Sequence, residues 1–300
     1  MTDITVVMAT YKQAKYLTES VRSVLLQSIH PSLRVQSVQS DTKTAKILRN
    51  IYVGDVEWID FADQPSKVAN MWKQRMNGLK NMGYPEPKYI CFFDSDDVML
   101  PGWLDRGLKV AEEIKSRGKI PIVGPSYRMV DEKLRPLGST KPITTVPAKN
   151  GWPDMDIVPF GIGKSYAIFP KALAHYPSDV ILPEFSMDRM MEGCVIPDFS
   201  ITTTEALRSV GGFFDPDGFD PGHPYFGFAM WLRLLKKYGN QVEVKLLPDI
   251  GFLYRQHRKG MHQRFAFTKK KSRQNVLRQQ QIARHYFPEV RDAKGSEVTE

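Results

Sequence analysis

The sequence predicts an α/β fold built around a mainly parallel, twisted sheet with helices on both faces. Through the first half of the chain, apolar runs of strand length alternate with segments whose apolar residues recur at helical spacing. The run at 89–93 is apolar without alternation, which is typical of a strand covered on both faces. Strands that alternate with helices favour parallel pairing, because each helix returns the chain to the same end of the sheet.

Ahead of that central run, the chain contains three predicted strands and two predicted helices. The strands are expected at 4–9, 33–38 and 50–53, each a short apolar run. The helices are expected at 13–28 and 66–82, where apolar side chains recur every three or four residues. In the first helix the apolar stripe consists of Leu17, Val21, Val24 and Leu25.

After the central run, the predicted elements become less regular. Pro101 is expected in the first turn of a third helix, where its missing N–H costs no hydrogen bond, and 120–123 is expected to be a strand. Residues 135–200 are rich in Pro and Gly and show little periodicity, so we expect loops and short strands there. The remaining predictions are helices at 204–210, 226–238 and 268–286 and strands at 242–247 and 250–254.

The composition is that of a soluble globular protein with a sizeable core. The chain has 300 residues, of which 42% are hydrophobic and 25% are charged. Its N-terminus has no signal-peptide pattern, and no apolar stretch approaches the roughly 20 residues that a membrane-spanning helix needs. The two cysteines, Cys91 and Cys194, do not make a disulfide framework. We therefore expect a cytoplasmic protein without a transmembrane segment.

Positive charge is concentrated toward the C-terminus. The formal net charge is +9, and residues 255–284 contain ten Lys or Arg and no Asp or Glu. A basic segment of this kind fits a polyanionic partner, such as nucleic acid, an acidic lipid surface or a phosphate-rich substrate. The alternative interpretation is a solvated helix face.

Three carboxylates follow the central apolar run: Asp94, Asp96 and Asp97. In an open parallel sheet, ligands bind beyond the carboxyl ends of the strands, where these residues are expected. Like charges this close repel one another unless a cation lies between them. The Asp-x-Asp spacing allows Asp94 and Asp96 to approach one hard cation, with water and phosphate oxygens completing the shell. The alternative is a solvated turn, and Asp97 is expected to be a turn residue.

Five segments, in order, resemble those of family-2 glycosyltransferases, which have the GT-A fold. ITVVMATYKQAKYL at 4–17, followed by SVLLQS at 23–28, resembles the family's opening strand, loop and helix. FFDSDDVMLPGWL at 92–104 is similar to its Asp-x-Asp segment. The three other similarities are TEALRSVGGF at 204–213 to the Gly-Gly-Phe motif, MWLRL at 230–234 to the helix behind it, and YRQH at 254–257 to the Tyr-Arg-x-His motif.

The resemblance implies a fold, a domain plan and an activity. The fold would be GT-A, a Rossmann-like sheet with a small acceptor-side subdomain. Residues 1–125 would bind the nucleotide-sugar donor, 126–262 would form the acceptor-side half, and 263–300 would be a basic tail, part of it helical. The activity would be metal-dependent transfer of a sugar from a nucleotide-sugar, a UDP-sugar, to an acceptor hydroxyl with inversion. The metal would be Mn²⁺ or Mg²⁺.

The resemblance also implies roles for individual residues. Asp94 would contact the nucleotide ribose, and Arg255 would meet the diphosphate; Gln39 competes with Asp41 for the acid that contacts the base or ribose. Arg75 as a solvated helix charge and His257 as part of a basic loop are the alternative interpretations. The residues implied to bind the donor are Ala9, Thr10, Tyr11, Asp41, Arg75, Asp94 and Arg255, and those implied to bind the metal are Asp94, Asp96 and His257.

The chain departs from the family pattern at the general base. Inverting enzymes of the family take the acceptor's proton with an acid that precedes the Trp-Leu-Arg helix, but here those positions are Phe226, Gly227 and Ala229. His223 and Asp220 are the candidates to replace it, since an imidazole titrates near neutral pH and a carboxylate can act directly or orient it. Ordinary turn chemistry is the alternative for both residues.

The sequence leaves the acceptor, the function and the oligomeric state open. The acceptor is unknown; DNA that carries a hydroxymethylated base and a sugar on a lipid phosphate at an acidic membrane surface are two candidates that fit the basic segment at 255–284, and an oligosaccharide is a third. The alternative function is a catalytically reduced transferase fold that binds sugar nucleotides or nucleic acid. The oligomeric state is unknown.

Overall fold

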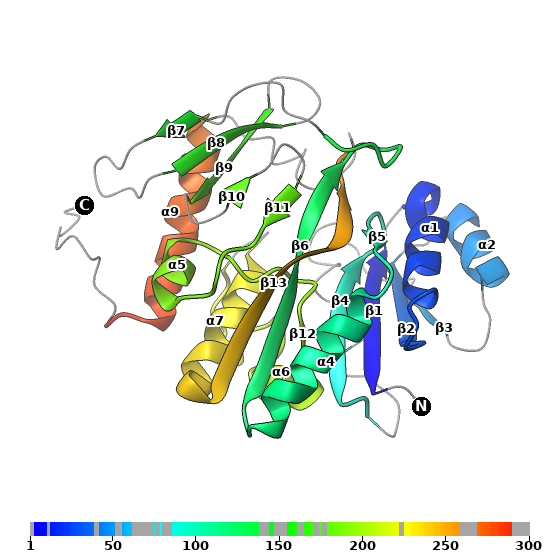
Figure 1. Cartoon of the computed structure of the whole chain (residues 1–300), viewed down its shortest axis with the longest axis horizontal. Coiled ribbons are helices and arrows are strands. Elements are labelled where there is room, and N and C mark those ends of the chain that lie inside the picture. The colour runs from blue at the N-terminus through cyan, green and yellow to red at the C-terminus, as the bar shows by residue number, and fades with distance from the viewer. Residues whose placement is uncertain are drawn as a thin grey trace. The chain divides into compact units, whose positions relative to one another are not determined.

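The computed structural model describes residues 3–10, 13–38, 42–51, 56–61, 75, 79, 86–137, 144–146, 155–160, 165–170, 174–175, 179–221, 225–257 and 269–289 (Figure 1). The chain divides into two units, which are described separately. The first unit comprises residues 1–125 and 196–247, and the second comprises 126–195 and 248–300. The strands β6 (Ile120–Val130) and β13 (Val242–Arg255) contribute residues to both units.

The first unit is built on a mainly parallel sheet with the strand order β6-β12-β4-β1-β2-β3. The strand β12 runs antiparallel to its neighbours β4 and β6, and the other pairs, β1 with β4, β1 with β2 and β2 with β3, are parallel. The predicted α/β class with a mainly parallel sheet is therefore confirmed. The bounds of the strands are β1 (Ile4–Thr10), β2 (Ser32–Val38), β3 (Val56–Phe61), β4 (Tyr89–Asp94) and β12 (Ile201–Thr203).

The core of this unit lies along its central strands. All seven residues of β1 are buried, and so are the first five of β4, from Tyr89 to Phe93. Unbroken burial means that both faces of these strands are covered, which explains why their sequences do not alternate. The parallel register pairs Ala9 with Asp94, so the carboxyl ends of β1 and β4 lie side by side.

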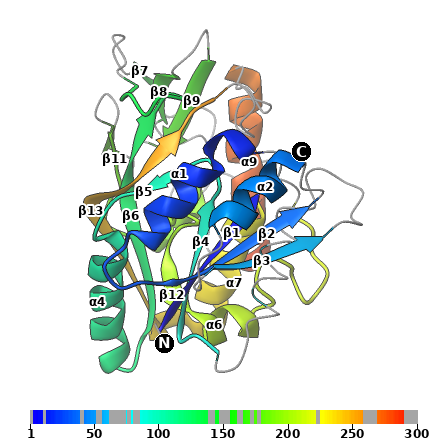
Figure 2. The ribbon, with the colours of Figure 1, turned by 90° about the vertical axis from the view of Figure 1, so that its right-hand side faces the viewer.

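Helices cover the sheet of the first unit. In Figure 2, α1 (Ala14–Leu25) and α2 (Thr42–Ile51) lie in front of β1, β2 and β3, while α6 (Thr204–Ser209) and α7 (Phe226–Tyr238) lie behind the sheet. Helix α4 (Trp103–Ser116) contacts β12, and a short 3-10 turn, Gly239–Gln241, follows α7. The predicted stripe of α1 is confirmed, because Leu17, Val21 and Val24 are fully buried.

Several predicted elements differ from the structure. The strand predicted at 50–53 is wrong, because residues up to Ile51 belong to α2, where Thr44 and Leu48 are buried at helical spacing. Pro101 precedes α4 by two residues, and Gly102 in the left-handed region caps the helix. The two strands predicted within 242–254 are one strand, β13. The helix predicted at 66–82 lies mostly outside the described residues, although Arg75 and Leu79 are helical.

The second unit contains antiparallel strand pairs and a three-stranded sheet. Within it, β11 (Asp179–Ile181) pairs antiparallel with β6 and with β10 (Ala174–His175). A separate antiparallel sheet consists of β7 (Thr144–Val146), β8 (Met155–Phe160) and β9 (Ser165–Pro170). Helix α5 (Met187–Glu192) contacts α9 (Lys269–Tyr286), which confirms the helix predicted near the C-terminus. Within the described part of the chain, no helix combines the length and apolar character needed to cross a membrane.

Polar side chains of α1 and of the turn after it hold the segment that follows β4. Ser20 Oγ donates a hydrogen bond to the carbonyl of Asp97 at 2.5 Å, and Ser23 Oγ accepts one from the amide of Met99 at 3.0 Å. Gln27 is 1% exposed, and its side chain donates to the carbonyl of Leu100 and accepts from a backbone amide at the start of α4. Ser20 and Ser23 lie on α1 and Gln27 lies two residues beyond its end, so α1 and the turn after it fix the course of the chain from Asp97 onward.

We predict that Gln27→Ala lowers the free energy of unfolding by about 2 kcal/mol, because it leaves a buried backbone donor and a buried acceptor without partners. The neighbouring Leu26→Ala is the control, since Leu26 is 77% exposed and its truncation should change stability by less than about 0.5 kcal/mol. Urea unfolding of the two variants checks this. A larger loss in the leucine variant would contradict it.

Candidate functional site

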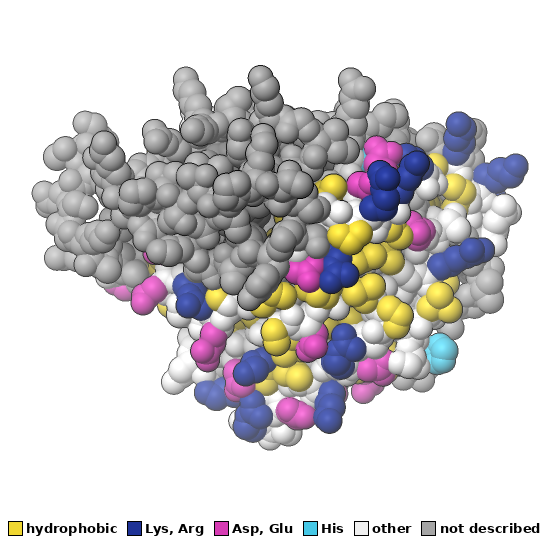
Figure 3. All heavy atoms as spheres, turned by 45° about the horizontal axis from the view of Figure 1, so that its top comes forward, with side chains coloured by type: hydrophobic (Ala, Val, Ile, Leu, Met, Phe, Trp, Pro, Cys, Tyr) yellow, Lys and Arg dark blue, Asp and Glu magenta, His cyan; other side chains and the backbone are white. Residues whose placement is uncertain are grey.

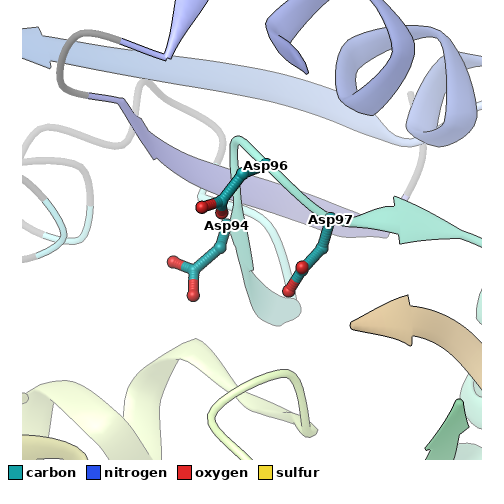
Figure 4. A group of neighbouring side chains, drawn as sticks. All are labelled: Asp94, Asp96 and Asp97. Atoms are coloured by element: carbon teal, nitrogen blue, oxygen red, sulfur yellow. The ribbon is translucent and has the colours of Figure 1, made fainter. Parts of the chain in front are cut away.

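The acidic turn after β4 consists of Asp94, Asp96 and Asp97. Each offers a carboxylate oxygen within 4.8 Å of the others, and in the described part of the chain this is the group that can surround a cation. In Figure 4, the three side chains extend from the end of β4 and from the turn that follows it. Asp97 lies further along the turn than Asp94 and Asp96. Carboxylate oxygens gathered in this way suit a hard divalent cation.

The start of α1 orients one of these carboxylates. Gln13 precedes the first residue of α1, and its Nε2 donates a hydrogen bond to Asp96 Oδ2 at 3.2 Å. This contact connects the loop after β1 to the loop after β4, across the edge of the sheet where parallel strands end. Sequence analysis missed Gln13, because a lone glutamine after a strand carries no distinctive signal.

The predicted donor residues on β1 lie beside this turn. Ala9 pairs with Asp94 in the register of β1 and β4, and it is buried. Thr10, the last residue of β1, is 2% exposed. The structure therefore places Ala9 and Thr10 in β1 rather than in the loop expected after it, with Ala9 beside Asp94; their role in donor binding stays a prediction. Tyr11, Asp41 and Gln39 lie outside the described residues.

Arg75 forms the electrostatic centre of the site. Its side chain is 1% exposed, and it donates to Asp94 Oδ1 at 2.6 Å and to Asp198 Oδ2 at 2.9 Å. The guanidinium carbon lies 5.7 Å from the ring centre of Phe92 and 5.5 Å from that of Phe213, a distance at which aromatic faces attract cations. The alternative interpretation of Arg75 as a solvated helix charge is therefore wrong.

The charges of this site affect one another strongly. Burial raises the pKa of Asp94 to about 6; the Arg75 guanidinium opposes this change, while the negative charges of Asp96 and Asp198 add to it. Burial on its own would lower the pKa of Arg75, but Asp94 and Asp198 raise it above its ordinary value, so the guanidinium stays charged. The single positive charge of Arg75 thus lies among the carboxylates of Asp94, Asp96 and Asp198. The site can therefore attract a further cation.

The Gly-Gly-Phe motif forms one wall of the Arg75 site. Gly211 and Gly212 have φ values of 75° and 58°, a left-handed conformation that turns the chain sharply after α6. The turn inserts Phe213 into the core, with its ring edge-on to Phe92 at 4.7 Å. Arg233 of α7 donates hydrogen bonds to the carbonyls of Val210 and Gly212, which fixes the turn against the helix.

Helix α7 carries no carboxylate in its first turn. Phe226, Gly227 and Ala229 occupy the positions at which the resemblance expects acids, and Gly227 and Ala229 are buried. A Cβ built on Gly227 would lie 2.0 Å from Asp198 Oδ1, so the Asp198 carboxylate fills the space that a side chain there would enter. Sequence analysis missed Asp198, which lies in a loop before β12 without any recognisable motif.

The four remaining predicted residues are Asp220, His223, Arg255 and His257. Asp220 is exposed, and His223 lies outside the described residues. Arg255 and His257 belong to the second unit, where both are buried and Arg255 donates to the carbonyl of Glu132 at 3.1 Å. The roles of these four residues stay predictions.

We predict that Arg75→Met lowers the free energy of unfolding by about 3–5 kcal/mol, because Asp94 and Asp198 lose their buried cation. Arg117→Met is the matched control: its ion pair with Glu243 is about half exposed, so its loss should cost less than about 1 kcal/mol. Chemical denaturation gives both values. Equal losses would contradict the prediction, whereas partial recovery on adding Asp94→Asn and Asp198→Asn to Arg75→Met would support it.

Comparison with known proteins identifies the family of the chain. Among solved structures, S. aureus TarS residues 1–349 in complex with UDP-GlcNAc superpose with a TM-score of 0.51 and 15% identity, covering 95% of this chain and 71% of that one. S. aureus TarS 1–349 without a named ligand gives a TM-score of 0.48, 16% identity and coverage of 84% and 60%, and the S. aureus TarS structure described without residue limits gives 0.49, 14%, 85% and 37%. The chain thus spans less than two thirds of the length of the latter two structures.

At 15% identity, the likeness to the UDP-GlcNAc complex shows a shared fold. Among curated proteins, none matches the sequence. The family match is more extensive, because residues 5–163, more than half of the chain, match the family described as glycosyl transferase family 2. The matched segment includes nearly all of β1, the acidic turn after β4 and Arg75. The chain therefore belongs to glycosyl transferase family 2.

Proposed function

We propose that this protein is a metal-dependent glycosyltransferase, which moves a sugar from a nucleotide-sugar donor to an acceptor hydroxyl with inversion at the anomeric carbon. The observation that carries the proposal is the acidic turn at the carboxyl end of β4, in which the buried Arg75 holds Asp94 at 2.6 Å. A site of this kind suits a nucleotide diphosphate bound through a cation, and membership of glycosyl transferase family 2 supports a sugar as the transferred group.

The residues of the acidic turn fit a divalent cation. Asp94, Asp96 and Asp97 offer oxygens within 4.8 Å of one another, a grouping of carboxylates that supports a cation site. Oxygen ligands favour Mg²⁺ or Mn²⁺, either of which would stabilise negative charge on the leaving nucleotide. We propose Asp94 and Asp96 as ligands; His257 is proposed as a further ligand on the family resemblance alone.

The proposed donor is a UDP-sugar. UDP-GlcNAc is the first to test, because TarS 1–349 has been solved with it. Ala9 and Thr10 lie at the end of β1, where Ala9 pairs with Asp94, and they are proposed as donor contacts from that end of the strand. Arg75 would act by holding Asp94 in place for the ribose. Tyr11, Asp41 and Arg255 are proposed as further donor contacts.

A general base must take the proton of the acceptor hydroxyl during inversion. His223 and Asp220, both ahead of α7, are candidates from the loop that the family resemblance identifies. Substituting each one, as His223→Ala and Asp220→Asn, and measuring sugar transfer would test their involvement. Unchanged transfer in both variants would eliminate them as the base.

The proposed acceptor is polyanionic. Among the described side chains on the face in Figure 3, Lys and Arg are interspersed with Asp and Glu, so the proposal depends on the segment 255–284, most of whose basic side chains are not described. DNA that carries a hydroxymethylated base and a lipid phosphate at an acidic membrane are the two candidates. DNA binding that weakens steeply with salt in a gel shift would support the first, because phosphate contacts release counterions. Absence of such binding would favour the lipid.

A second candidate function is a binding module that keeps the fold but has lost transfer. The observation in its favour is the start of α7, where Phe226, Gly227 and Ala229 replace the expected acids. Incubation with a panel of UDP-sugars in the presence of Mn²⁺ separates the two functions. An enzyme releases UDP from at least one donor of this panel, whereas a binding module binds UDP but releases no UDP from any of the donors.

We predict that Asp96→Asn weakens binding of Mn²⁺ and of UDP with Mn²⁺ by at least about tenfold, because a carboxylate ligand becomes a neutral amide. Asp217→Asn is the control, since Asp217 is an exposed aspartate in a turn. Isothermal titration calorimetry measures both affinities. Unchanged metal and nucleotide binding in Asp96→Asn would rule out this metal site.

We predict that Mn²⁺ binding weakens as the pH falls through about 6. The pKa of Asp94 is raised to about 6 mainly by burial, so below that pH protons compete with the cation for the carboxylate. The sign follows because only the ionised carboxyl binds: affinity should be constant above about pH 7 and fall about tenfold per pH unit below 6. Titrations of the metal alone from pH 5 to 8 measure this, and a constant affinity down to pH 5 would refute it.

A further inference from the structure

Asp198 lies where the first turn of α7 lacks a side chain. A Cβ on Gly227 would be 2.0 Å from Asp198 Oδ1, 2.8 Å from its Cγ and 3.0 Å from its Oδ2. All three carboxyl atoms therefore surround the point at which a side chain at position 227 would begin. The site thus has a carboxylate where α7 itself supplies none, and the carboxylate comes from the loop before β12.

The carboxylate of Asp198 is held firmly through one oxygen. Its Oδ2 accepts a hydrogen bond from Arg75 Nη1 at 2.9 Å. Its loop is closed by Ser200, whose amide and hydroxyl both donate to the carbonyl of Pro197, at 3.1 and 2.8 Å. The fixed loop and the arginine together orient the carboxyl group, so that Oδ1 faces the start of α7.

The Asp198 side chain is 28% exposed, and among the residues that the structure describes none donates a hydrogen bond to its Oδ1. It is also close to the proposed donor site, because the same guanidinium binds Asp94 Oδ1 at 2.6 Å. Asp94 and Asp198 are thus held next to each other by one side chain.

We propose that Asp198 is the general base of the transfer reaction, an inference that rests on the proposed glycosyltransferase function. As the acceptor oxygen forms its bond to the anomeric carbon, Oδ1 takes the proton of the acceptor hydroxyl. The bond between the anomeric carbon and the diphosphate oxygen breaks, and its electron pair leaves with the nucleoside diphosphate. Asp198 then releases the proton to solvent. A base of this kind typically contributes about 10²–10⁴-fold to the rate.

The competing interpretation is that Asp198 serves only as a counter-ion for Arg75. Asp198→Asn separates the two roles, because an amide oxygen still accepts from Arg75 but the side chain no longer takes a proton. For a general base we expect UDP release from the best donor of the panel to fall at least about 100-fold, with UDP binding in Mn²⁺ changed less than about threefold. For a counter-ion alone, binding and turnover would decline together or not at all, which would overturn the proposal.

Chemical rescue and relocation of the carboxylate give two further readouts. Formate should restore turnover at least about tenfold in Asp198→Gly, where it can occupy the vacated space, and should not do so in Asp198→Asn. The double variant Asp198→Gly with Gly227→Asp moves a carboxylate onto α7 and should be more active than Asp198→Gly alone. Failure of both rescues would overturn the proposal.

Gly227→Ala tests the same contact from the side of α7. Its methyl group would displace the Asp198 carboxyl, so turnover should fall in the folded variant, with folding checked by thermal unfolding. Full activity in this variant would count against Asp198. The wild-type protein separates failure of the transferase proposal from failure of the base assignment. If it binds UDP but turns over no donor, the transferase proposal fails; if it turns over and Asp198→Asn equals it, only the assignment of the base fails.

Discussion

The first unit depends on one buried cation shared between two carboxylates. Arg75 is 1% exposed and binds Asp94, at the end of a central parallel strand, and Asp198, in the loop before an antiparallel strand. Burial of charges this close is costly unless each finds a partner. Because one guanidinium partners both carboxylates, it fixes the end of β4 and the loop before β12 in a single geometry, and the aromatic rings of Phe92 and Phe213 enclose it.

The family motifs act mostly through this arrangement. The SVLLQS segment supplies Ser23 and Gln27, whose hydrogen bonds hold the chain just after the acidic turn. The Gly-Gly-Phe segment supplies the left-handed turn that places Phe213 against Phe92 and the guanidinium of Arg75. Motifs far apart in the sequence therefore converge on the carboxyl ends of β1 and β4. Their spacing in the sequence reflects this structural requirement as much as any direct contact with a ligand.

Sequence reasoning predicted those parts of the fold that have a strong local pattern. The strand ending at Asp94 and the stripe of α1 were predictable, because full burial removes alternation and helical burial repeats every three or four residues. The strand expected at 50–53 was wrong, since the apolar residues there continue the helical period of α2. Asp198 could not be predicted, because its importance comes from Arg75 and Gly227, 123 and 29 positions away in the sequence.

At position 227, the absence of an acid from α7 and the position of Asp198 are linked by one packing constraint. Any side chain at position 227 would begin within 2.0 Å of Asp198 Oδ1, and glycine alone leaves that space open. A side chain at position 227 and the observed carboxylate at 198 therefore exclude each other in this geometry. Since Asp198 is joined to Asp94 through Arg75, the loop before β12 places negative charge next to the acidic turn, while the first turn of α7 has no acid. The absence of an acid at position 227 is thus compatible with a carboxylate at the same place in the fold.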